Sequence, residues 1–483
     1  MFWRGLWGYL PANIVQGAVG FLAIVIFTRL LTPDDFGRYA LAYAVLTLSH
    51  VAVFTWLEAA MARFWAAQQT PAQIADHFRS LYRTVFGLSA LFVPMVALVL
   101  WLWPAPMALK AALAAGLLGV PVRCVVRLVQ ERYRAAGEVG PAARLDMAQS
   151  VLGLLIGVGF AWAGFGGAAP LIGLALAPVL ALPFILPAEL KFAREGQVDS
   201  ARLRSYAAYG YPIAASLALT VILSSTDRFL LAAFMNEATV GAYHAGYSLA
   251  NRTLDVMFIW LGAAGGPALV MALERGGREA LASAAREQFS TFVLLALPAC
   301  VGLMLVAGPL NTLMIGEALR ADATRITPWI ALAALLSGMT TYYFHQAFTL
   351  ARRTGWLLGV MAIPALSNVV LNVLLIPAFG IMGAAWATVA SFAVGLLASI
   401  LIGRAVMPMP VHWRTLAQCG LGCTVMAVVV LMLPAWGGLP ELLLKAAVGA
   451  GVYGVVVLAL DTAGIRRLVR GRLLRLREGG GMA

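Results

Sequence analysis

Runs of apolar residues, separated by short polar segments, follow one another along nearly the whole chain. A run of about 20 such residues is what an α-helix needs to cross the hydrocarbon core of a bilayer. The runs are continuously apolar, whereas strands of a membrane barrel alternate apolar and polar positions over about ten residues. We therefore predict an all-α polytopic membrane protein with about 14 transmembrane helices. The predicted spans are 6–31, 39–61, 81–103, 111–129, 147–164, 168–188, 209–233, 243–271, 289–308, 327–350, 355–377, 381–403, 415–434 and 441–460.

The chain contains an internal repeat. Residues 37–43 and 241–247 share the pattern G-x-Y-x-x-x-Y, and each follows a short polar segment that we interpret as a turn. Duplicated halves are how many membrane transporters are built. The predicted organisation is two six-helix lobes of the MATE/MOP-like type, a linker, two further helices and a basic tail. These parts span 1–188 (N-terminal lobe), 189–208 (cytoplasmic linker), 209–403 (C-terminal lobe), 404–460 (helices 13 and 14) and 461–483 (tail).

Composition and charge agree with membrane insertion. Hydrophobic residues make up 62% of the chain and charged residues 11%, against about 45–50% and 25% in soluble domains. If the N-terminus is cytoplasmic, 26 of the 34 Lys and Arg residues lie in segments predicted to be cytoplasmic, Arg123 and Arg127 among them. This positive-inside bias predicts that both termini are cytoplasmic. It also accounts for the net charge of +13 without nucleic-acid binding.

Three longer patterns carry a family resemblance. They are R-x-L-T-P-D-D-F-G-R-Y-A at 29–40, D-R-F-L-L-x(6)-E-A-T-V-G-A-Y-H-A-G-Y at 227–247, and I-P-A-F-G-I-M-G-A-A-W-A-T at 376–388. Together they make the chain resemble polysaccharide biosynthesis proteins of the Wzx-type oligosaccharide flippase family, within the MOP exporter superfamily. The resemblance covers residues 5 to about 403.

The resemblance implies a function and a place in the cell. It implies a flippase, and no enzyme, that moves undecaprenyl-diphosphate-linked oligosaccharide across the bacterial cytoplasmic membrane for O-antigen, capsule or exopolysaccharide synthesis. The implied partners are the lipid-linked oligosaccharide, membrane lipid and polysaccharide assembly proteins, and no cofactor is implied. A MATE-type drug exporter and a lipid II flippase are the alternatives. Many Wzx-like proteins have twelve helices, whereas lipid II flippases have fourteen. The first helix of a lipid II flippase is expected to be rich in arginine, but the predicted first helix here has only Arg4 and Arg29, at its ends. The arginine content of this helix therefore disfavours a lipid II flippase.

Four charged residues inside predicted helices are the candidate substrate site: Asp227, Arg228, Arg252 and Asp255. A charge at the centre of a membrane helix costs about 2.5–3.5 kcal/mol on insertion scales, so such residues are functional hypotheses by default. They either form self-neutralising buried pairs, or the arginines bind a pyrophosphate in bidentate fashion. The equivalent first-half positions are apolar, so the charges belong to one copy of the repeat only.

Glu58 and His50 on the second predicted helix, together with Asp255, are the candidates for coupling to an ion gradient. The competing interpretation pairs Glu58 with Arg63 at the interface and leaves His50 as a buried, hydrogen-bonded residue. Asn368 and Asn372 are expected to form interhelical hydrogen bonds. The four cysteines are expected to be packing residues. We find no metal-ligand cluster, Walker loop or catalytic constellation in the sequence. A membrane enzyme such as a polysaccharide polymerase is the alternative from another functional class.

Overall fold

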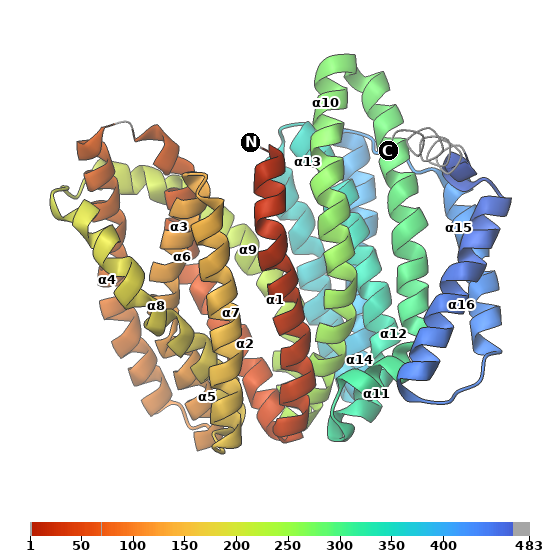
Figure 1. The fold of residues 1–483 in the computed structure, drawn as a ribbon, viewed down its shortest axis with the longest axis horizontal. Coiled ribbons are helices and arrows are strands. Elements are labelled where there is room, and N and C mark those ends of the chain that lie inside the picture. Colours follow the sequence, from red (N-terminus) through yellow and green to blue (C-terminus); the bar gives the residue numbers. More distant parts are fainter. Residues whose placement is uncertain (1, 69, 467–483) are drawn as a thin grey trace, which may run out of the picture. The chain divides into compact units, whose positions relative to one another are not determined.

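Long α-helices run through almost all of the chain that the computed structural model describes, which is residues 2–68 and 70–466 (Figure 1). No strand occurs among these residues. The first helices are α1 (Phe2–Leu30), α2 (Pro33–Val53), α3 (Thr55–Phe64), α4 (Pro71–Leu102), α5 (Met107–Leu118), α6 (Val120–Ala135), α7 (Val139–Trp162), α8 (Ala169–Arg194) and α9 (Ser200–Phe234). The remaining helices are α10 (Glu237–Leu305), α11 (Ala307–Met314), α12 (Glu317–Met339), α13 (Gln346–Leu350), α14 (Thr354–Val406), α15 (Trp413–Leu431) and α16 (Gly438–Ala459).

Two of these helices fold back on themselves at a glycine. Gly277 in α10 has φ of 65° and Gly380 in α14 has φ of 58°, a backbone conformation that glycine adopts without steric cost. Figure 1 shows α10 turning over in this way at one end. Eleven helices are long and apolar enough to cross a membrane within the described residues. Gly277 divides α10 into two arms, and Gly380 divides α14 into two arms. When each arm is counted as one span and the α12–α13 segment is added, the eleven become the predicted fourteen, so the predicted fold class is confirmed.

The helices α2 and α10 begin six residues before the predicted starts at 39 and 243. The polar segments that we interpreted as turns are capped first turns of these helices. The Thr32 hydroxyl accepts a hydrogen bond from the backbone N–H of Asp35 at 3.2 Å, and the Asn236 side-chain oxygen accepts one from Thr239 at 2.8 Å. Such caps satisfy backbone donors that have no partner within the helix. The two capping residues are equivalent in the repeat.

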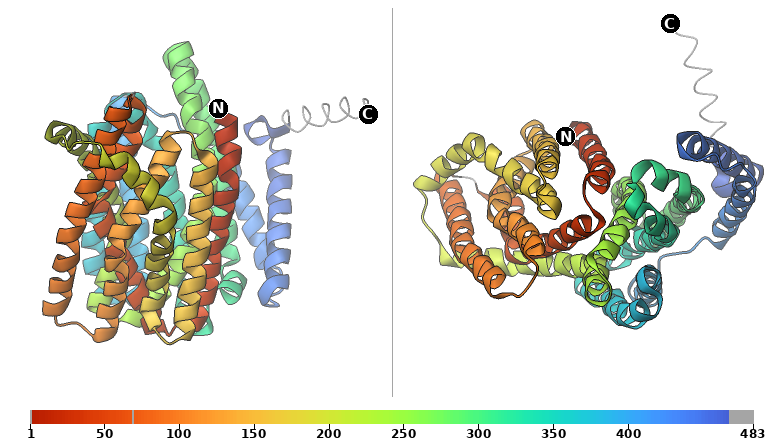
Figure 2. Two further views of the ribbon diagram at one scale, coloured as in Figure 1. Left: turned by 60° about the vertical axis from the view of Figure 1, so that its left-hand side comes forward. Right: turned by 90° about the horizontal axis from the view of Figure 1, so that it is seen from below.

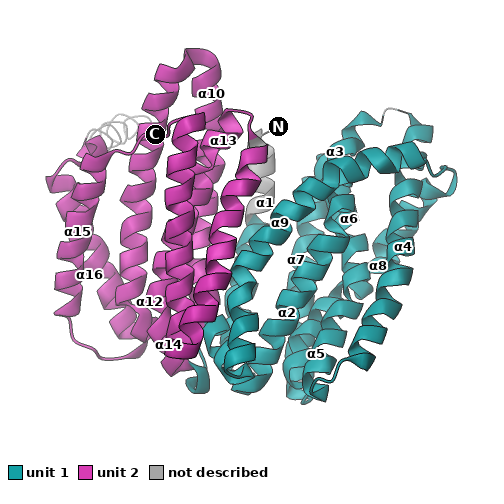
Figure 3. Cartoon of the chain, turned by 180° about the vertical axis from the view of Figure 1, so that it is seen from behind, with its two compact units in different colours: residues 1–245, 315–319 teal, residues 246–314, 320–483 magenta. Residues whose placement is uncertain are grey.

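The chain forms two compact units, shown in different colours in Figure 3. Unit 1 contains residues 1–245 and 315–319, and unit 2 contains residues 246–314 and 320–483. In unit 1, α9 packs along α2 and α3, and the Tyr211 ring of α9 stacks on Trp56 with centroids 5.1 Å apart. Residues 209–234 therefore pack with unit 1, although the predicted linker ends at 208. The predicted lobes and linker stay a prediction.

Within unit 2, the two C-terminal helices α15 and α16 pack together and against the second arm of α10 (Figure 2). Cys423 and Met426 of α15 and Tyr453 of α16 form a small buried cluster on Leu297 and neighbouring apolar residues. All four cysteines are buried, in agreement with their predicted packing role. The predicted basic tail lies outside the described residues from residue 467 onward.

The repeated glycines lie against each other in unit 1. A Cβ atom at Gly37 would overlap the carbonyl oxygen of Glu237, and one at Gly241 would lie 2.5 Å from the carbonyl oxygen of Pro33. These two contacts are equivalent under the repeat, so the capped ends of α2 and α10 cross as a symmetric pair. Arg38 adds an ion pair to Glu237 at 2.6 Å. The repeated motif therefore lets the first turns of α2 and α10 pack closely where the two helices cross.

We expect Gly37→Ala to destabilise the protein. The added methyl group would meet backbone rather than a movable side chain, and overpacking of this kind costs about 1–3 kcal/mol. Thermal unfolding of the purified protein should show a lower midpoint. Gly87→Ala in α4 is the control, because nothing lies within 4 Å of a Cβ atom at that position. Equal midpoints for the two variants would contradict the crossing account.

Candidate functional site

Asp227 and Arg228 lie near the end of α9, and both are buried. The Arg228 guanidinium lies 3.7 Å from the Asp227 carboxylate. It also donates hydrogen bonds to Nδ1 of His244, at 3.2 Å, and to the carbonyl oxygen of Ser224. The Asp227 carboxylate in turn accepts the backbone N–H of Arg228 at 2.8 Å. The two charges thus have partners inside unit 1, as the buried-pair interpretation predicts.

His244 completes this cluster from α10. It belongs to the repeated segment 241–247, and its ring also contacts the rings of Phe36 and Tyr39. The cluster therefore lies beside the crossing of α2 and α10. Since buried charges are retained when paired and hydrogen-bonded, we interpret Asp227 and Arg228 as a fixed polar junction between α9 and α10.

Arg252 and Asp255 have a different environment, in unit 2. Asp255 is partly buried and accepts a hydrogen bond from the amide of Asn251, one turn earlier on α10. Arg252 is exposed. Among the described residues it forms no hydrogen bond and no ion pair within 4.0 Å. Arg252 and Asp255 form no ion pair within 4.0 Å among the described residues, although the Arg252 charge still acts on this carboxylate, to which Asn251 donates its hydrogen bond.

The position of Arg252 along α10 bears on its role. It lies 15 residues, or about 22 Å at 1.5 Å per residue, from the start of α10 at Glu237. This distance is shorter than a hydrocarbon core of about 30 Å. An arginine within a membrane-spanning helix faces a protein interior or a water-filled cavity, and it often marks a substrate path. Arg252 is therefore the predicted site residue best suited to bind an anion.

His50 and Glu58 meet in unit 1. His50 Nε2 lies 2.8 Å from Glu58 Oε1, and both side chains are nearly buried. Eight residues would separate them by about 12 Å along an unbroken helix. The break between α2 and α3 at Phe54, where φ is −118°, brings them together. The alternative pairing of Glu58 with Arg63 is wrong, because Glu58 is close to His50 and Arg63 is exposed.

Two arginines that were not among the predicted site residues, Arg123 and Arg127, lie near this pair. Arg123 lies close to Tyr43, Glu58 and Arg127. Both arginines lie inside α6, within a span that runs from Met107 to Ala135, and inside the predicted span 111–129, although we counted them with the cytoplasmic charges that set the topology. Their i,i+4 spacing places both on one helix face. That spacing can be read from the sequence. It indicates a basic helix face inside unit 1, in addition to Arg252 in unit 2.

Asn368 and Asn372 are almost completely buried on the first arm of α14. The expected interhelical hydrogen bonds do not form at these amides. Asn372 donates instead to the carbonyl oxygen of Asn368, at 2.8 Å within the same helix. The side-chain amide of Asn368 has no hydrogen-bond partner within the part of the chain that the structure describes. Among the described residues, no group of three or more His, Cys, Asp or Glu side chains could hold a metal ion.

Comparison with solved structures identifies the architecture. The chain is similar to the lipid II flippase MurJ in an inward closed conformation, with a TM-score of 0.76 and 13% identity over 95% of this chain and 99% of that chain. It is also similar to a multidrug resistance MATE family transporter of the MOP superfamily in an inward-facing conformation. There the TM-score is 0.66 and the identity 14%, over 81% of this chain and 95% of that chain. At these identities the likeness shows the fold alone.

Comparison with protein families identifies the family of this chain. The family model described as polysaccharide biosynthesis protein matches residues 26–321. No curated protein matches the chain. The family match includes the repeated motifs, the Asp227–Arg228 cluster and Arg252. Because it covers more than half of the chain, this multi-pass membrane protein belongs to the polysaccharide biosynthesis protein family.

Proposed function

We propose that this protein is a flippase that moves undecaprenyl-diphosphate-linked oligosaccharide across the bacterial cytoplasmic membrane, for O-antigen, capsule or exopolysaccharide synthesis. The family membership and the MOP-type fold support a flippase. The observation that carries the choice of an anionic substrate is Arg252, an exposed arginine part of the way along a membrane-spanning helix that forms no ion pair within 4.0 Å among the described residues.

The chemistry of the substrate fits such a residue. The pyrophosphate of a lipid-linked sugar carries its charge at the junction of an apolar tail and a polar glycan. A guanidinium binds two phosphate oxygens through parallel N–H donors. Because Arg252 forms no ion pair within 4.0 Å among the described residues, it has no close ion pair to break before it binds phosphate. Arg123 and Arg127 offer a second basic site in unit 1.

A drug exporter of the MATE type is the alternative transporter with this fold. Export of organic cations favours acidic groups facing the substrate, whereas Arg252 is exposed and Asp227 is paired with Arg228. Deleting the gene and measuring both surface polysaccharide and drug sensitivity distinguishes the two proposals. Our proposal expects loss of surface polysaccharide, accumulation of lipid-linked repeat units and unchanged drug sensitivity. Normal polysaccharide together with hypersensitivity to cationic drugs would instead favour the exporter.

The close contact between His50 and Glu58 supports a proposed role of this pair in coupling transport to a proton gradient. A histidine beside a carboxylate can exchange protons in the physiological pH range. We expect Glu58→Gln to remove the acceleration of transport by a proton gradient and to leave substrate binding intact, as measured in proteoliposomes with an imposed pH difference. Glu274→Gln is the control, because that carboxylate is 63% exposed and distant in sequence. A Glu58→Gln variant with full gradient dependence would exclude this pair.

A further inference from the structure

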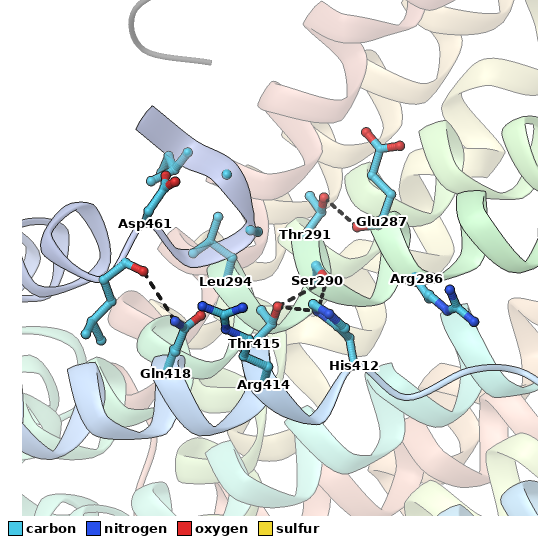
Figure 4. Close-up of a pocket in the computed structure, with 14 residues that line it drawn as sticks. Arg286, Glu287, Ser290, Thr291, Leu294, His412, Arg414, Thr415, Gln418 and Asp461 are labelled. Atoms are coloured by element: carbon cyan, nitrogen blue, oxygen red, sulfur yellow. Dashed lines mark hydrogen bonds between the residues drawn. The ribbon is translucent and has the colours of Figure 1, made fainter. Parts of the chain in front are cut away.

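A polar cavity of about 490 Å³ lies in unit 2 where α15 begins (Figure 4). Its walls come from the second arm of α10, the first turns of α15 and the segment that follows α16. The positive-inside bias predicts that this end of α15 faces the cytoplasm. The volume is in the range of small-molecule sites. Nothing in the proposed transport path uses this cavity.

The cavity has a cationic part. Arg414 and Arg286 line it and are both exposed. Neither forms an ion pair within 4.0 Å among the described residues. In Figure 4 the Arg414 guanidinium lies between the side chains of Gln418 and Thr415, and Arg286 lies at the edge. Two guanidinium groups with free donors are suited to phosphate oxygens.

Hydrogen bonds fix the floor of the cavity. The Nδ1 atom of His412 lies 2.5 Å from the Thr415 hydroxyl and 3.2 Å from the Ser290 hydroxyl. Gln418 donates to the carbonyl oxygen of Leu460 at 3.3 Å, which ties α15 to the end of α16. These contacts hold the start of α15 in place, so Arg414 extends from an ordered surface.

The cavity also has an acidic part. Asp461 and Glu287 line it together with the two arginines, so the four formal charges cancel. Asp461 adopts φ of 47° and Ala463 φ of 54°. These left-handed conformations are costly for residues with a side chain and cluster at ligand sites. A purely anionic ligand would meet repulsion from the carboxylates, whereas a zwitterion with one phosphate and one amine complements both signs.

An apolar cavity of about 510 Å³ adjoins the polar one. Leu294 lines both, and the apolar cavity continues from it between the second arm of α10 and the α15–α16 pair. Leu305 and Val306 line it on one side and Val430 on another. Beside the polar cavity, Trp413 is 68% exposed, and exposed tryptophans concentrate at membrane–water interfaces. The two cavities together have the polarity profile of a phospholipid.

We propose that the two cavities bind one zwitterionic aminophospholipid of the bilayer. Its phosphate lies at Arg414 and Arg286, its primary amine at Asp461 and Glu287, and one acyl chain follows the apolar cavity from Leu294. The amine explains the carboxylates, and the chain explains the adjoining apolar space. This lipid is a bound component of unit 2 and is distinct from the transported substrate, so the proposal is independent of the proposed function.

Native mass spectrometry of the purified full-length protein tests this proposal. Delipidated protein is titrated with dioleoyl phosphatidylethanolamine, phosphatidylglycerol or phosphatidylcholine, and separately with soluble glycerophosphoethanolamine. We expect one phosphatidylethanolamine to be retained, with at least about tenfold weaker retention in Arg414→Ala/Arg286→Ala. This is the effect of losing about 1.4 kcal/mol, close to the smallest contribution expected of one charge-assisted hydrogen bond. Arg404→Ala, another exposed cytoplasm-side arginine outside the cavity, should bind as the wild type does.

Each other outcome overturns a stated part of the proposal. Equal retention of phosphatidylglycerol would overturn the amine assignment, and so would an Asp461→Asn variant with unchanged lipid preference. Equal affinity for glycerophosphoethanolamine would overturn the membrane as the source. Wild-type retention by the double arginine variant would overturn the site. Arg414→Lys/Arg286→Lys retains both charges and should restore binding, which excludes misfolding as the cause of the loss.

Discussion

Arg252→Ala should abolish export of the cognate polysaccharide while the protein remains in the membrane. Arg252 is exposed and forms no ion pair within 4.0 Å among the described residues, so its removal breaks no close ion pair. Loss of hydrogen bonds to a charged group costs about 1.5–3 kcal/mol each, which is about 10- to 100-fold in affinity. Export is measured as surface polysaccharide, and protein amount by immunoblotting of membranes.

The matched control is Arg278→Ala. Arg278 is also an exposed arginine of α10, but it lies beside the glycine at which the helix folds back. Its substitution should leave export unchanged. Arg252→Lys keeps the charge but loses the planar pair of donors, so we expect an intermediate level of export. Wild-type export by Arg252→Ala would contradict the anion site.

Arg228→Ala should destabilise the protein rather than act on substrate binding alone. Arg228 is buried with Asp227, and its guanidinium also binds His244 and Ser224. Removal of one partner from a buried ion pair costs about 3–5 kcal/mol, because the remaining charge stays buried without compensation. The expected result is a large fall in the thermal unfolding midpoint of purified protein and a smaller amount in membranes.

Two comparisons isolate this effect. Asp227→Ala/Arg228→Ala should be less destabilised than the sum of the single variants, because it leaves no unpaired charge. Arg325→Ala removes an exposed ion pair with Asp322, in which the two side chains are 65% and 49% exposed. Such surface pairs contribute about 0–1 kcal/mol. An Arg228→Ala protein as stable as Arg325→Ala would show that the junction of α9 and α10 does not depend on this cluster.

Composition and apolar run length were sufficient to predict the fold class, because the bilayer requires every span to be a long apolar helix. Helix starts were less predictable. The segments at Thr32 and Asn236 contain residues common in both turns and helix caps, and here they cap α2 and α10. The fold-back at Gly277 joins two spans without a loop, which the pattern of apolar runs does not reveal.

The candidate site was predictable where contacts are local. Asp227 and Arg228 are adjacent in sequence, and their pairing followed from burial. Local spacing was misleading at Asp255, because Asn251 and Arg252 both lie within one turn and the amide forms the hydrogen bond. The contact of His50 with Glu58 depends on a break at Phe54. No glycine or proline marks that break, so only the structure could show it.

We propose that the chain transports an anionic lipid-linked oligosaccharide and binds it through Arg252. The most direct test is transport of a fluorescent undecaprenyl-diphosphate-linked oligosaccharide by the purified full-length protein in proteoliposomes, with a membrane-impermeant quencher reporting the leaflet. We predict that wild-type protein and Arg278→Ala move the lipid between leaflets and that Arg252→Ala does not. Movement of the lipid no faster than in protein-free vesicles, or equal rates for Arg252→Ala and wild type, would contradict the account.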